Sequence, residues 1–239
     1  MGLTKSSVGI GAVDSGLIIK KQSPGDKIIA LAGNPNVGKS TVFNALTGLN
    51  QHTGNWPGKT VANAQGYCKS EKHSYVLVDI PGTYSLMAHS AEEEVARNFI
   101  CFGAPDAVAV VCDATCLERN MNLVLQTLEI SSNVIVCVNL MDEARRKKIN
   151  IDLKQLEERL GVPVIGVTAR KKKSLKRLLD ALDLTCEQKT ANTPYIMRYS
   201  PEIESAIALV EPEVKRLSQG KINSHWLSLK LLDGDSSLI

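Results

Sequence analysis

The sequence predicts a doubly wound, mostly parallel α/β sheet followed by a small all-α subdomain. Between residues 27 and 172, five short runs rich in Val, Ile and Leu alternate with helix-like segments. Apolar runs of this length are typical of strands covered on both faces, and their alternation with helices favours parallel strands joined by crossover helices. After about residue 172 only helix-like segments follow.

The predicted strands occupy residues 27–33, 74–80, 107–114, 133–140 and 162–169, and residues 60–70 could add one antiparallel edge strand. Helices are predicted between them at residues 40–49, 91–103, 117–130 and 152–161. The last of these helices starts with Asp152 and Gln155 at the spacing of a capping box and stops at Gly161.

The tail is predicted to form helices at residues 174–184, 200–211, 212–219 and 223–234. Ser200 and Pro201 are typical of a helix start, and Pro212 is expected to kink or divide the helix that it enters. We therefore predict a flexible extension at residues 1–26, which are rich in Gly and Ser, a sheet domain at residues 27–172 and a helical domain at residues 173–239.

Composition narrows the class of protein only slightly. The hydrophobic share of 44% and the charged share of 22% are ordinary for a globular protein, and the net charge of +3 is too small to predict nucleic-acid binding by itself. No apolar run approaches the ~18–20 residues that a membrane helix needs. The six cysteines lie mostly in apolar runs without a second pair at metal-ligand spacing, so they are interpreted as small buried side chains.

The loop after the first predicted strand carries a phosphate-binding pattern. Gly33, four further residues and Gly38-Lys39-Ser40 match G-x-x-x-x-G-K-[ST]. The glycines allow backbone N–H groups to point at phosphate, Lys39 can reach the β- and γ-phosphates, and the Ser40 hydroxyl can ligate Mg²⁺. The predicted nucleotide contacts of this loop are Gly33, Asn34, Pro35, Asn36, Val37, Gly38, Lys39, Ser40 and Thr41.

Two weaker signals lie between the first loop and the third predicted strand. In "DIPG", Asp79 would hold Mg²⁺ through water and the N–H group of Gly82 would face the γ-phosphate; in "NWPGKTV", a mobile loop would bring the Thr60 hydroxyl to the metal. Ser40, Thr60 and Asp79 are therefore the predicted Mg²⁺ ligands, and Lys39, Thr60 and Gly82 the predicted catalytic residues. Further predicted contacts are Gly58, Lys59, Val61, Ile80 and Pro81.

Two motifs predict which base the site would hold. Asp142 of "NLMD" can accept hydrogen bonds from N1–H and the 2-amino group of guanine, which adenine cannot donate, while Asn139 would brace the loops. Ala169 of "VTAR" can donate its N–H to the guanine oxygen. The predicted contacts are Asn139, Leu140, Met141, Asp142, Val167, Thr168 and Ala169. Five motifs in order at the ends of strands predict a protein that binds GTP and GDP.

The motifs also resemble one family. "GNPNVGKSTVFNALTG", "GNWPGKTV", "DIPGTYSL", "NLMDEA" and "WLSLKLLDGD" are similar to the cytosolic N-terminal part of the bacterial ferrous-iron transport protein B family, over residues 27–235. The resemblance implies a P-loop GTPase fold, a helical domain like a nucleotide-dissociation inhibitor, and a transmembrane iron permease in the same longer protein as partner. It further implies a nucleotide switch that regulates iron uptake at the cytoplasmic face of the bacterial inner membrane.

The resemblance implies that Asn36 is a K⁺ ligand, so that the cation supplies positive charge beside the phosphates. The alternative is that Asn36 is a turn residue selected for its backbone conformation. Thr83 stands where Ras-like proteins carry a glutamine that orients water. We therefore expect slow intrinsic hydrolysis of GTP, stimulated by K⁺.

Two other functions stay open. An RNA- or ribosome-associated assembly GTPase would also carry "PNVGKST", but Leu140 replaces the lysine usual there, and aromatic residues are only 4% of the chain. The basic run at residues 170–177 favours RNA, although a solvated helix start or a nearby anionic lipid surface explains it equally well. We expect no nucleic-acid partner, and leave an oligomer open. The second of these hypotheses is a non-enzymatic switch, which binds GTP and GDP and in which hydrolysis only returns the protein to its GDP-bound state.

Overall fold

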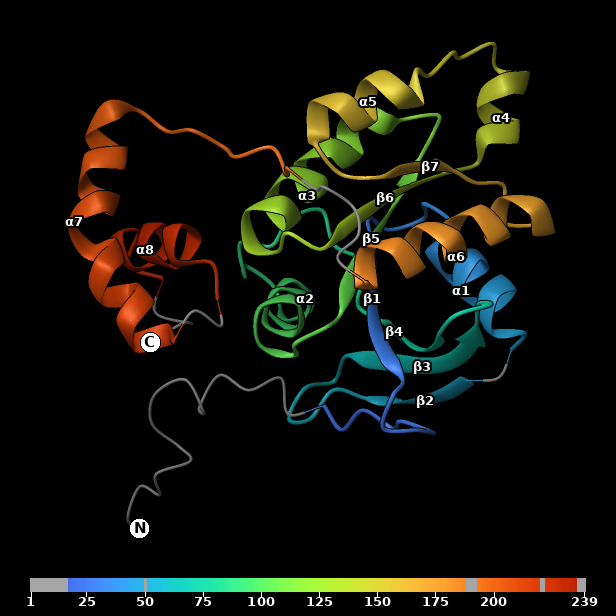
Figure 1. Cartoon of the computed structure of the whole chain (residues 1–239), viewed down its shortest axis with the longest axis horizontal. Coiled ribbons are helices and arrows are strands. Elements are labelled where there is room, and N and C mark those ends of the chain that lie inside the picture. The colour runs from blue at the N-terminus through green and yellow to red at the C-terminus, as the bar shows by residue number, and fades with distance from the viewer. Residues whose placement is uncertain (1–16, 50, 188–192, 220–221, 236–239) are drawn as a thin grey trace.

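The computed structural model describes residues 17–49, 51–187, 193–219 and 222–235 (Figure 1). Its strands are β1 (Lys27–Gly33), β2 (Gln51–Asn55), β3 (Ala62–Lys69), β4 (Ser74–Asp79), β5 (Ala107–Asp113), β6 (Val134–Asn139) and β7 (Val164–Gly166). Its helices are α1 (Lys39–Thr47), α2 (Ala91–Phe102), α3 (Leu117–Ile130), α4 (Met141–Arg146), α5 (Leu153–Leu160), α6 (Lys172–Cys186), α7 (Pro201–Ser218) and α8 (Ser224–Leu232).

The strands form one sheet in the order β2-β3-β4-β1-β5-β6-β7. The strands from β4 to β7 in this order are parallel, whereas β3 is antiparallel to β4 and β2 is antiparallel to β3. The predicted mostly parallel sheet with an antiparallel strand beside it is therefore confirmed. Strand β2 is an addition, because its sequence QHTGN has no apolar run that would predict a strand.

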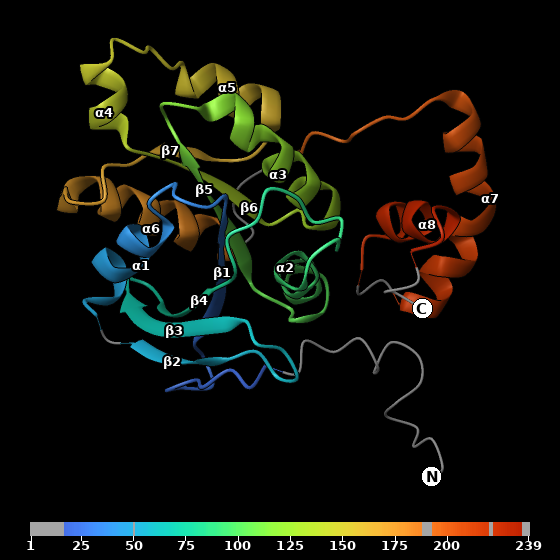
Figure 2. The ribbon, with the colours of Figure 1, turned by 180° about the vertical axis from the view of Figure 1, so that it is seen from behind.

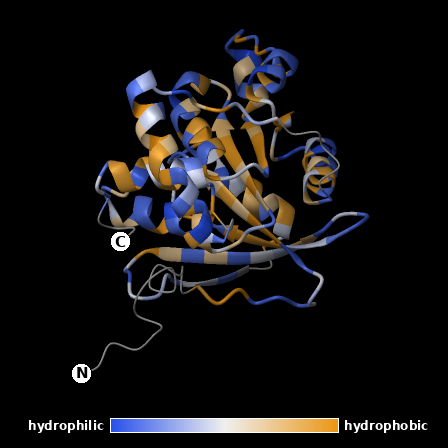
Figure 3. Cartoon of the chain, turned by 60° about the vertical axis from the view of Figure 1, so that its left-hand side comes forward, coloured by the Kyte–Doolittle hydropathy of each residue, from blue (hydrophilic) through white to orange (hydrophobic). Residues whose placement is uncertain are grey.

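Helices cover both faces of the sheet, as a doubly wound fold requires (Figure 2). Apolar residues of α2, α3 and α5 pack on one face, and those of α1 and α6 pack on the other. Figure 3 shows hydrophobic residues along the central strands and hydrophilic residues on the outer helical surfaces. Because β5 and β6 are buried almost throughout, their sequences AVAVVCD and VIVCVN do not alternate between polar and apolar residues.

Local signals place two of these helices accurately. The Asp152 carboxylate accepts a hydrogen bond from the Gln155 N–H at 2.9 Å, and α5 ends at Gly161 with a φ of 66°. This confirms the predicted cap and stop. In α2 the Ser90 hydroxyl accepts from the Glu93 N–H at 3.1 Å.

Helix α6 packs on the sheet. Its apolar residues Leu175, Leu178 and Leu182 belong to the buried cluster that includes β1, β5 and β6. The predicted division between residues 172 and 173 would separate this helix from the strands that it covers. We therefore propose that the sheet domain extends to the end of α6.

The tail consists of α7 and α8, which pack against each other. Helix α7 runs from Pro201 through Pro212 to Ser218, so the division predicted at Pro212 does not occur. Trp226 of α8 is buried in the cluster that includes α2 and α3. The Arg97 side chain of α2 is fully buried and forms an ion pair with Asp235 at 3.0 Å, which ties the end of the tail to the sheet domain.

The segment before β1 is attached to the sheet where the structure describes it. The Lys20 N–H donates to Gln65 Oε1 at 3.0 Å, Gln65 Nε2 donates to the Ile18 carbonyl at 3.0 Å, and the Tyr67 hydroxyl donates to the Lys20 carbonyl at 2.7 Å. Residues 17–26 thus differ from the loosely attached extension expected from their composition. The rest of that extension, residues 1–16, lies outside the described residues.

None of the described helices combines the length and the apolar character that a membrane crossing requires.

A polar cluster joins the β3–β4 hairpin to α6. Asp183 is buried and accepts hydrogen bonds from the hydroxyl of Tyr75 and, at 2.6 Å, from the hydroxyl of Ser70. Burial raises the pKa of Tyr75 further above its ordinary value, with the hydrogen bond to Asp183 acting in the same direction. The phenol therefore stays protonated and donates to the carboxylate.

We predict that Tyr75→Phe lowers the free energy of unfolding by about 1.5–3 kcal/mol, because a hydrogen bond to a charged, buried acceptor is lost. Urea unfolding monitored by circular dichroism measures this. Tyr67→Phe is the matched control, since its hydroxyl donates to an exposed carbonyl and should contribute less. Equal losses in the two variants would contradict the role given to Asp183.

Candidate functional site

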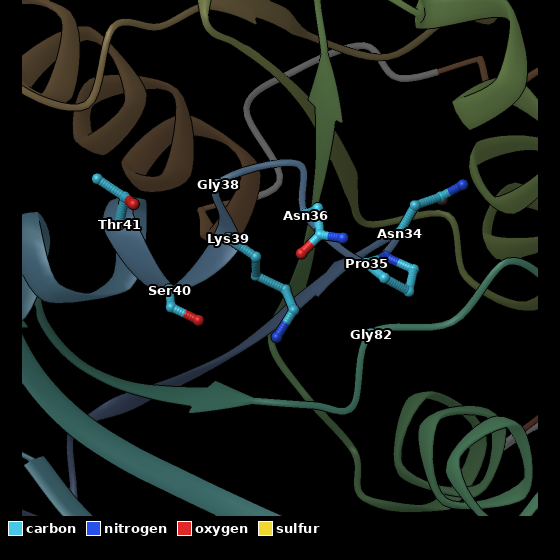
Figure 4. A pocket seen from close by; sticks show the side chains of 8 residues that line it. All are labelled: Asn34, Pro35, Asn36, Gly38, Lys39, Ser40, Thr41 and Gly82. Atoms are coloured by element: carbon cyan, nitrogen blue, oxygen red, sulfur yellow. The ribbon is translucent and has the colours of Figure 1, made fainter.

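A polar cavity lies at the carboxyl end of β1, where the strand order reverses (Figure 4). Its volume is about 530 Å³. Eight residues line it, and all eight were predicted from the sequence: Asn34, Pro35, Asn36, Gly38, Lys39, Ser40, Thr41 and Gly82. The phosphate-loop pattern and the "DIPG" motif, which are about 40 residues apart in the sequence, therefore meet at one site.

The loop between β1 and α1 is held close to its neighbours. Gly38 has a φ of 80°, and a Cβ atom there would lie 2.5 Å from Asn139 Nδ2. Asn139 Nδ2 in turn donates to the Val37 carbonyl at 3.1 Å. A side chain at position 38 would thus disrupt both the backbone conformation and the contact that joins this loop to the end of β6.

The first turn of α1 is open toward the cavity. Its N-cap is Gly38, so no side chain caps the helix. The first N–H groups of a helix have no partners within the helix and carry the positive end of the helix dipole. Lys39, Ser40 and Thr41 hold these first positions and line the cavity, which suits it to bind an anion.

Lys39 crosses the cavity to the end of β4. Its ammonium group forms an ion pair with Asp79 and donates to the Ile80 carbonyl at 2.8 Å. Burial raises the pKa of the Asp79 carboxyl, and Lys39 opposes this by stabilising the carboxylate. A cation and a carboxylate thus lie together at the place where the sequence predicts phosphate and metal binding.

The two asparagines of the loop have different surroundings. In Figure 4 the carboxamide of Asn36 turns toward Lys39, whereas the side chain of Asn34 points the other way. Asn36 has a left-handed backbone with a φ of 67°. Asn34 is 2% exposed, and neither its Oδ1 nor its Nδ2 has a hydrogen-bond partner among the described residues. Asn34 is among the predicted contacts of the loop, but no sequence signal indicates that its amide is buried.

The segment after Asp79 is docked on the phosphate loop and on α3. The Thr83 N–H donates to the Gly33 carbonyl at 3.3 Å, and Gly82 lies beside Pro35. Further along, the Leu86 N–H donates to Gln126 Oε1 of α3 at 2.6 Å. Thr83 is buried, which keeps its short side chain away from solvent.

The turn at residues 56–61 is packed against α2. Trp56 is 2% exposed and meets Phe99 edge-on, with ring centroids 5.3 Å apart, and Lys59 forms an ion pair with Glu94 at 2.8 Å. Thr60 is exposed and is not among the described residues that line the cavity. Neither α2 contact was expected from the sequence, since no local pattern identifies a partner about 40 residues away.

The predicted base-binding loops lie side by side at the ends of β6 and β7. The Met141 N–H donates to the Val167 carbonyl at 3.2 Å, and the Ser174 hydroxyl donates to the Thr168 carbonyl at 2.8 Å. Leu140 has a left-handed backbone with a φ of 61°, a conformation that costs a residue with a side chain about 1–2 kcal/mol. Asp142 is partly exposed in the first turn of α4.

Several predicted contact residues are buried in the core. The side chains of Val37, Val61, Ile80, Val167 and Ala169 all belong to the apolar clusters of the sheet. Only their backbone groups are therefore free to reach a ligand. Gly58, Lys59 and Pro81, like the base-binding loops, do not line the cavity.

Three of the six cysteines are buried, as expected from the sequence, and the other three are half-buried or exposed. Cys68, Cys112 and Cys137 are buried, and burial raises the pKa of the Cys137 thiol to about 12. Cys116 is exposed. Among the described residues, no three His, Cys, Asp or Glu side chains are grouped so that they could hold a metal ion.

Comparison with known proteins identifies two family models in succession. The model described as "Ferrous iron transport protein B" matches residues 27–182, and the model described as "FeoB cytosolic helical domain" matches residues 199–239. The Fe(2+) transporters FeoB of Escherichia coli K12 and Salmonella typhimurium LT2 are each 37% identical over 87% of this chain. The chain spans only 27% of the length of these curated relatives.

Solved structures show the same fold. The cytosolic domain of the Thermotoga maritima FeoB iron transporter in a GDP form has a TM-score of 0.81 and 35% identity, covering 89% of this chain and 82% of that one. The cytosolic domain of Legionella pneumophila FeoB has a TM-score of 0.76 and 36% identity, covering 88% and 82%. These matches do not favour the RNA-associated alternative. The chain belongs to the ferrous iron transport protein B family.

Proposed function

We propose that this chain binds GTP and GDP and hydrolyses GTP slowly, as the nucleotide switch of a bacterial ferrous-iron transporter. The observation that carries the proposal is the cavity in which the open first turn of α1, Lys39 and Gly82 converge. The solved T. maritima cytosolic domains in GDP and GMPPNP forms support it, because they share the fold of this chain.

The residues of the cavity define the binding chemistry. The N–H groups of the first turn of α1 and the Lys39 ammonium would surround the β- and γ-phosphates. Lys39 would exchange the Asp79 carboxylate for phosphate oxygens, since both compete for one ammonium group. The Gly82 N–H would face the γ-phosphate. Asp142 would accept from guanine, and the Ala169 N–H would donate to the guanine oxygen.

The donor set also fits Mg²⁺. A hydroxyl from Ser40, which lines the cavity, and a carboxylate from Asp79, which pairs with Lys39, are the hard oxygen ligands that this ion prefers. When bound, Mg²⁺ would neutralise charge on the phosphates. Thr60 would join these ligands only after the turn at residues 56–61 leaves its contacts with Phe99 and Glu94.

Asn36 is the residue that fits K⁺. Its left-handed backbone and its carboxamide turned into the cavity place a neutral oxygen donor beside Lys39. When bound, K⁺ would add positive charge where negative charge develops during phosphoryl transfer. Thr83 is too short and too buried to orient water as a glutamine does, which favours slow hydrolysis in the absence of such a cation.

Iron transport is proposed from the relatives. Those with 37% identity are named Fe(2+) transporters, and this chain covers 27% of their length, so the transmembrane part would be supplied by further residues of the same protein. We therefore place this domain at the cytoplasmic face of the bacterial inner membrane, where its nucleotide state would regulate iron uptake through α7 and α8.

We predict that Lys39→Ala weakens GTP binding at least about 100-fold, because a charge-assisted contact to the phosphates is removed. Titration with a fluorescent GTP analogue measures the dissociation constant. Lys69→Ala, an exposed lysine on β3, is the control and should bind like the unmodified protein. Wild-type affinity in Lys39→Ala would contradict the assignment of the loop.

We predict that Asp142→Asn shifts preference from guanine toward xanthine nucleotides, because the amide offers a donor where the carboxylate offers only acceptors. Competition between GTP and XTP for the site measures the ratio of affinities. Glu143→Gln removes a neighbouring charge that pairs with Arg146 and should keep the preference for GTP. An unchanged preference in Asp142→Asn would refute the base assignment.

We predict that GTP hydrolysis is at least about tenfold faster in KCl than in NaCl at equal ionic strength. Glycine adopts the left-handed backbone of position 36 without strain, so Asn36→Gly removes only the carboxamide. This variant should hydrolyse GTP at the same rate in both salts. Its rate in NaCl should equal that of the unmodified protein in NaCl. Equal rates of the unmodified protein in both salts would reduce Asn36 to a turn residue.

A further inference from the structure

A cationic surface, unused by the nucleotide site, lies on two segments that follow neighbouring strands. Residues 145–148 and residues 170–173 are two runs of four consecutive Arg or Lys residues. All eight are exposed. The cationic surface consists of Arg145, Arg146, Lys147, Lys148, Arg170, Lys171, Lys172 and Lys173.

The fold brings the two runs to the same edge of the sheet. Strands β6 and β7 are parallel neighbours, with Val138 beside Gly166. Helix α4 follows β6 directly, α6 follows β7 after a short loop, and the Met141 N–H donates to the Val167 carbonyl at 3.2 Å. In both Figure 1 and Figure 2, α4 and the first turns of α6 lie on the same flank of the sheet domain.

The charge of this surface is largely uncompensated. Within residues 140–148 and 167–173 the acidic residues are Asp142 and Glu143, so these two segments carry eight cations and two carboxylates. In the described part of the chain, only Arg146 of the eight forms an ion pair, with Glu143. The whole chain has a net charge of +3, so the rest of the protein is net negative. Like charges this close together repel one another, and a bound polyanion would relieve that repulsion.

The composition of the surface favours lipid headgroups over RNA. Residues 139–177 include no aromatic residue, although single-stranded RNA is recognised largely by stacking on aromatic rings. The exposed apolar residue is instead aliphatic, since Ile149 directly follows the first run and is 38% exposed. Cations with an interspersed aliphatic side chain suit the boundary between headgroups and acyl chains.

We propose that the cationic surface binds the anionic headgroups of a lipid bilayer. The relatives are named transporters, so this domain would work beside a membrane in which such headgroups are concentrated. Docking would turn the base-binding edge of the sheet toward the bilayer. The proposal concerns residues outside the nucleotide-binding set and is tested without nucleotide, so its outcome is independent of the proposed function.

Sedimentation with lipid vesicles tests the proposal. The 239-residue chain is mixed with vesicles of phosphatidylglycerol and phosphatidylcholine, or of phosphatidylcholine alone. We expect sedimentation only with the anionic vesicles, and an apparent affinity that falls at least about tenfold from low salt to about 0.5 M NaCl, where the Debye length is only a few ångströms. Absent binding, or equal binding to neutral vesicles, overturns the proposal.

Charge-reversed variants locate the binding surface. Lys171→Glu/Lys172→Glu/Lys173→Glu and Arg145→Glu/Lys147→Glu/Lys148→Glu should each weaken vesicle binding at least about tenfold. The matched control, Lys20→Glu/Lys21→Glu/Lys69→Glu, changes the net charge equally at exposed positions elsewhere and should weaken it less than about threefold. Unchanged melting by circular dichroism shows that each variant is folded. An equal loss in the control would reduce the effect to net charge and refute the assigned surface.

Two competitors distinguish the source of the anion. Inorganic phosphate at about 10 mM, with ionic strength held constant, should leave the protein on the vesicles, because a headgroup layer is polyvalent. Displacement by phosphate would refute a membrane-binding surface. Tighter binding to a single-stranded RNA than to anionic vesicles, lost in the same two variants, would overturn the lipid assignment in favour of RNA.

Discussion

The site depends on one buried hydrogen bond, from Asn139 Nδ2 to the Val37 carbonyl. It links the phosphate loop after β1 to the end of β6, two strands away in the sheet. Because Gly38 lacks a side chain, the Asn139 amide fits against the loop. A buried hydrogen bond contributes only about 1 kcal/mol net, but an unpaired carbonyl would cost about 1–3 kcal/mol. The bond therefore matters less for stability than for fixing the phosphate-binding loop relative to the base-binding loops.

Sequence predicted those parts of the molecule that are encoded locally. The buried strands, the cap at Asp152 and the phosphate loop rest on residue type and short spacing, and each has the predicted form. Strand β2 could not be predicted, because its pairing comes from β3 and not from its own residues. The apolar residues of α6 have a clear helical period, but this period does not indicate which part of the protein the helix packs against.

In the candidate site too, local features were predicted from the sequence and long-range contacts were not. The eight residues that line the cavity were all identified from two short motifs. The ion pair of Lys39 with Asp79, the burial of the Asn34 amide and the packing of Trp56 on Phe99 depend on residues far apart in sequence. These contacts decide how the motifs are held, and only the three-dimensional arrangement shows them. Thr60 is an example: its motif is present in the sequence, but Thr60 is not among the described residues that line the cavity.

Helix α2 contacts both the turn at residues 56–61 and the helical tail. Glu94 and Phe99 hold the turn at residues 56–61, and Arg97 of the same helix pairs with Asp235 after α8. Arg97 is fully buried, and removing the partner of a buried charge typically costs about 3–5 kcal/mol. A shift of the turn that moved α2 would therefore be resisted by the tail, or would carry the tail with it.

The two tryptophans of the chain lie one in each of these parts. Trp56 is in the turn at residues 56–61 and Trp226 is in α8, and both are almost completely removed from solvent. The unlabelled protein thus contains two intrinsic fluorophores, one for the loop and one for the tail. Replacing either by phenylalanine would leave a single emitter, whose wavelength and quenching report on its own segment. The chain can in this way reveal optically whether the two segments move together.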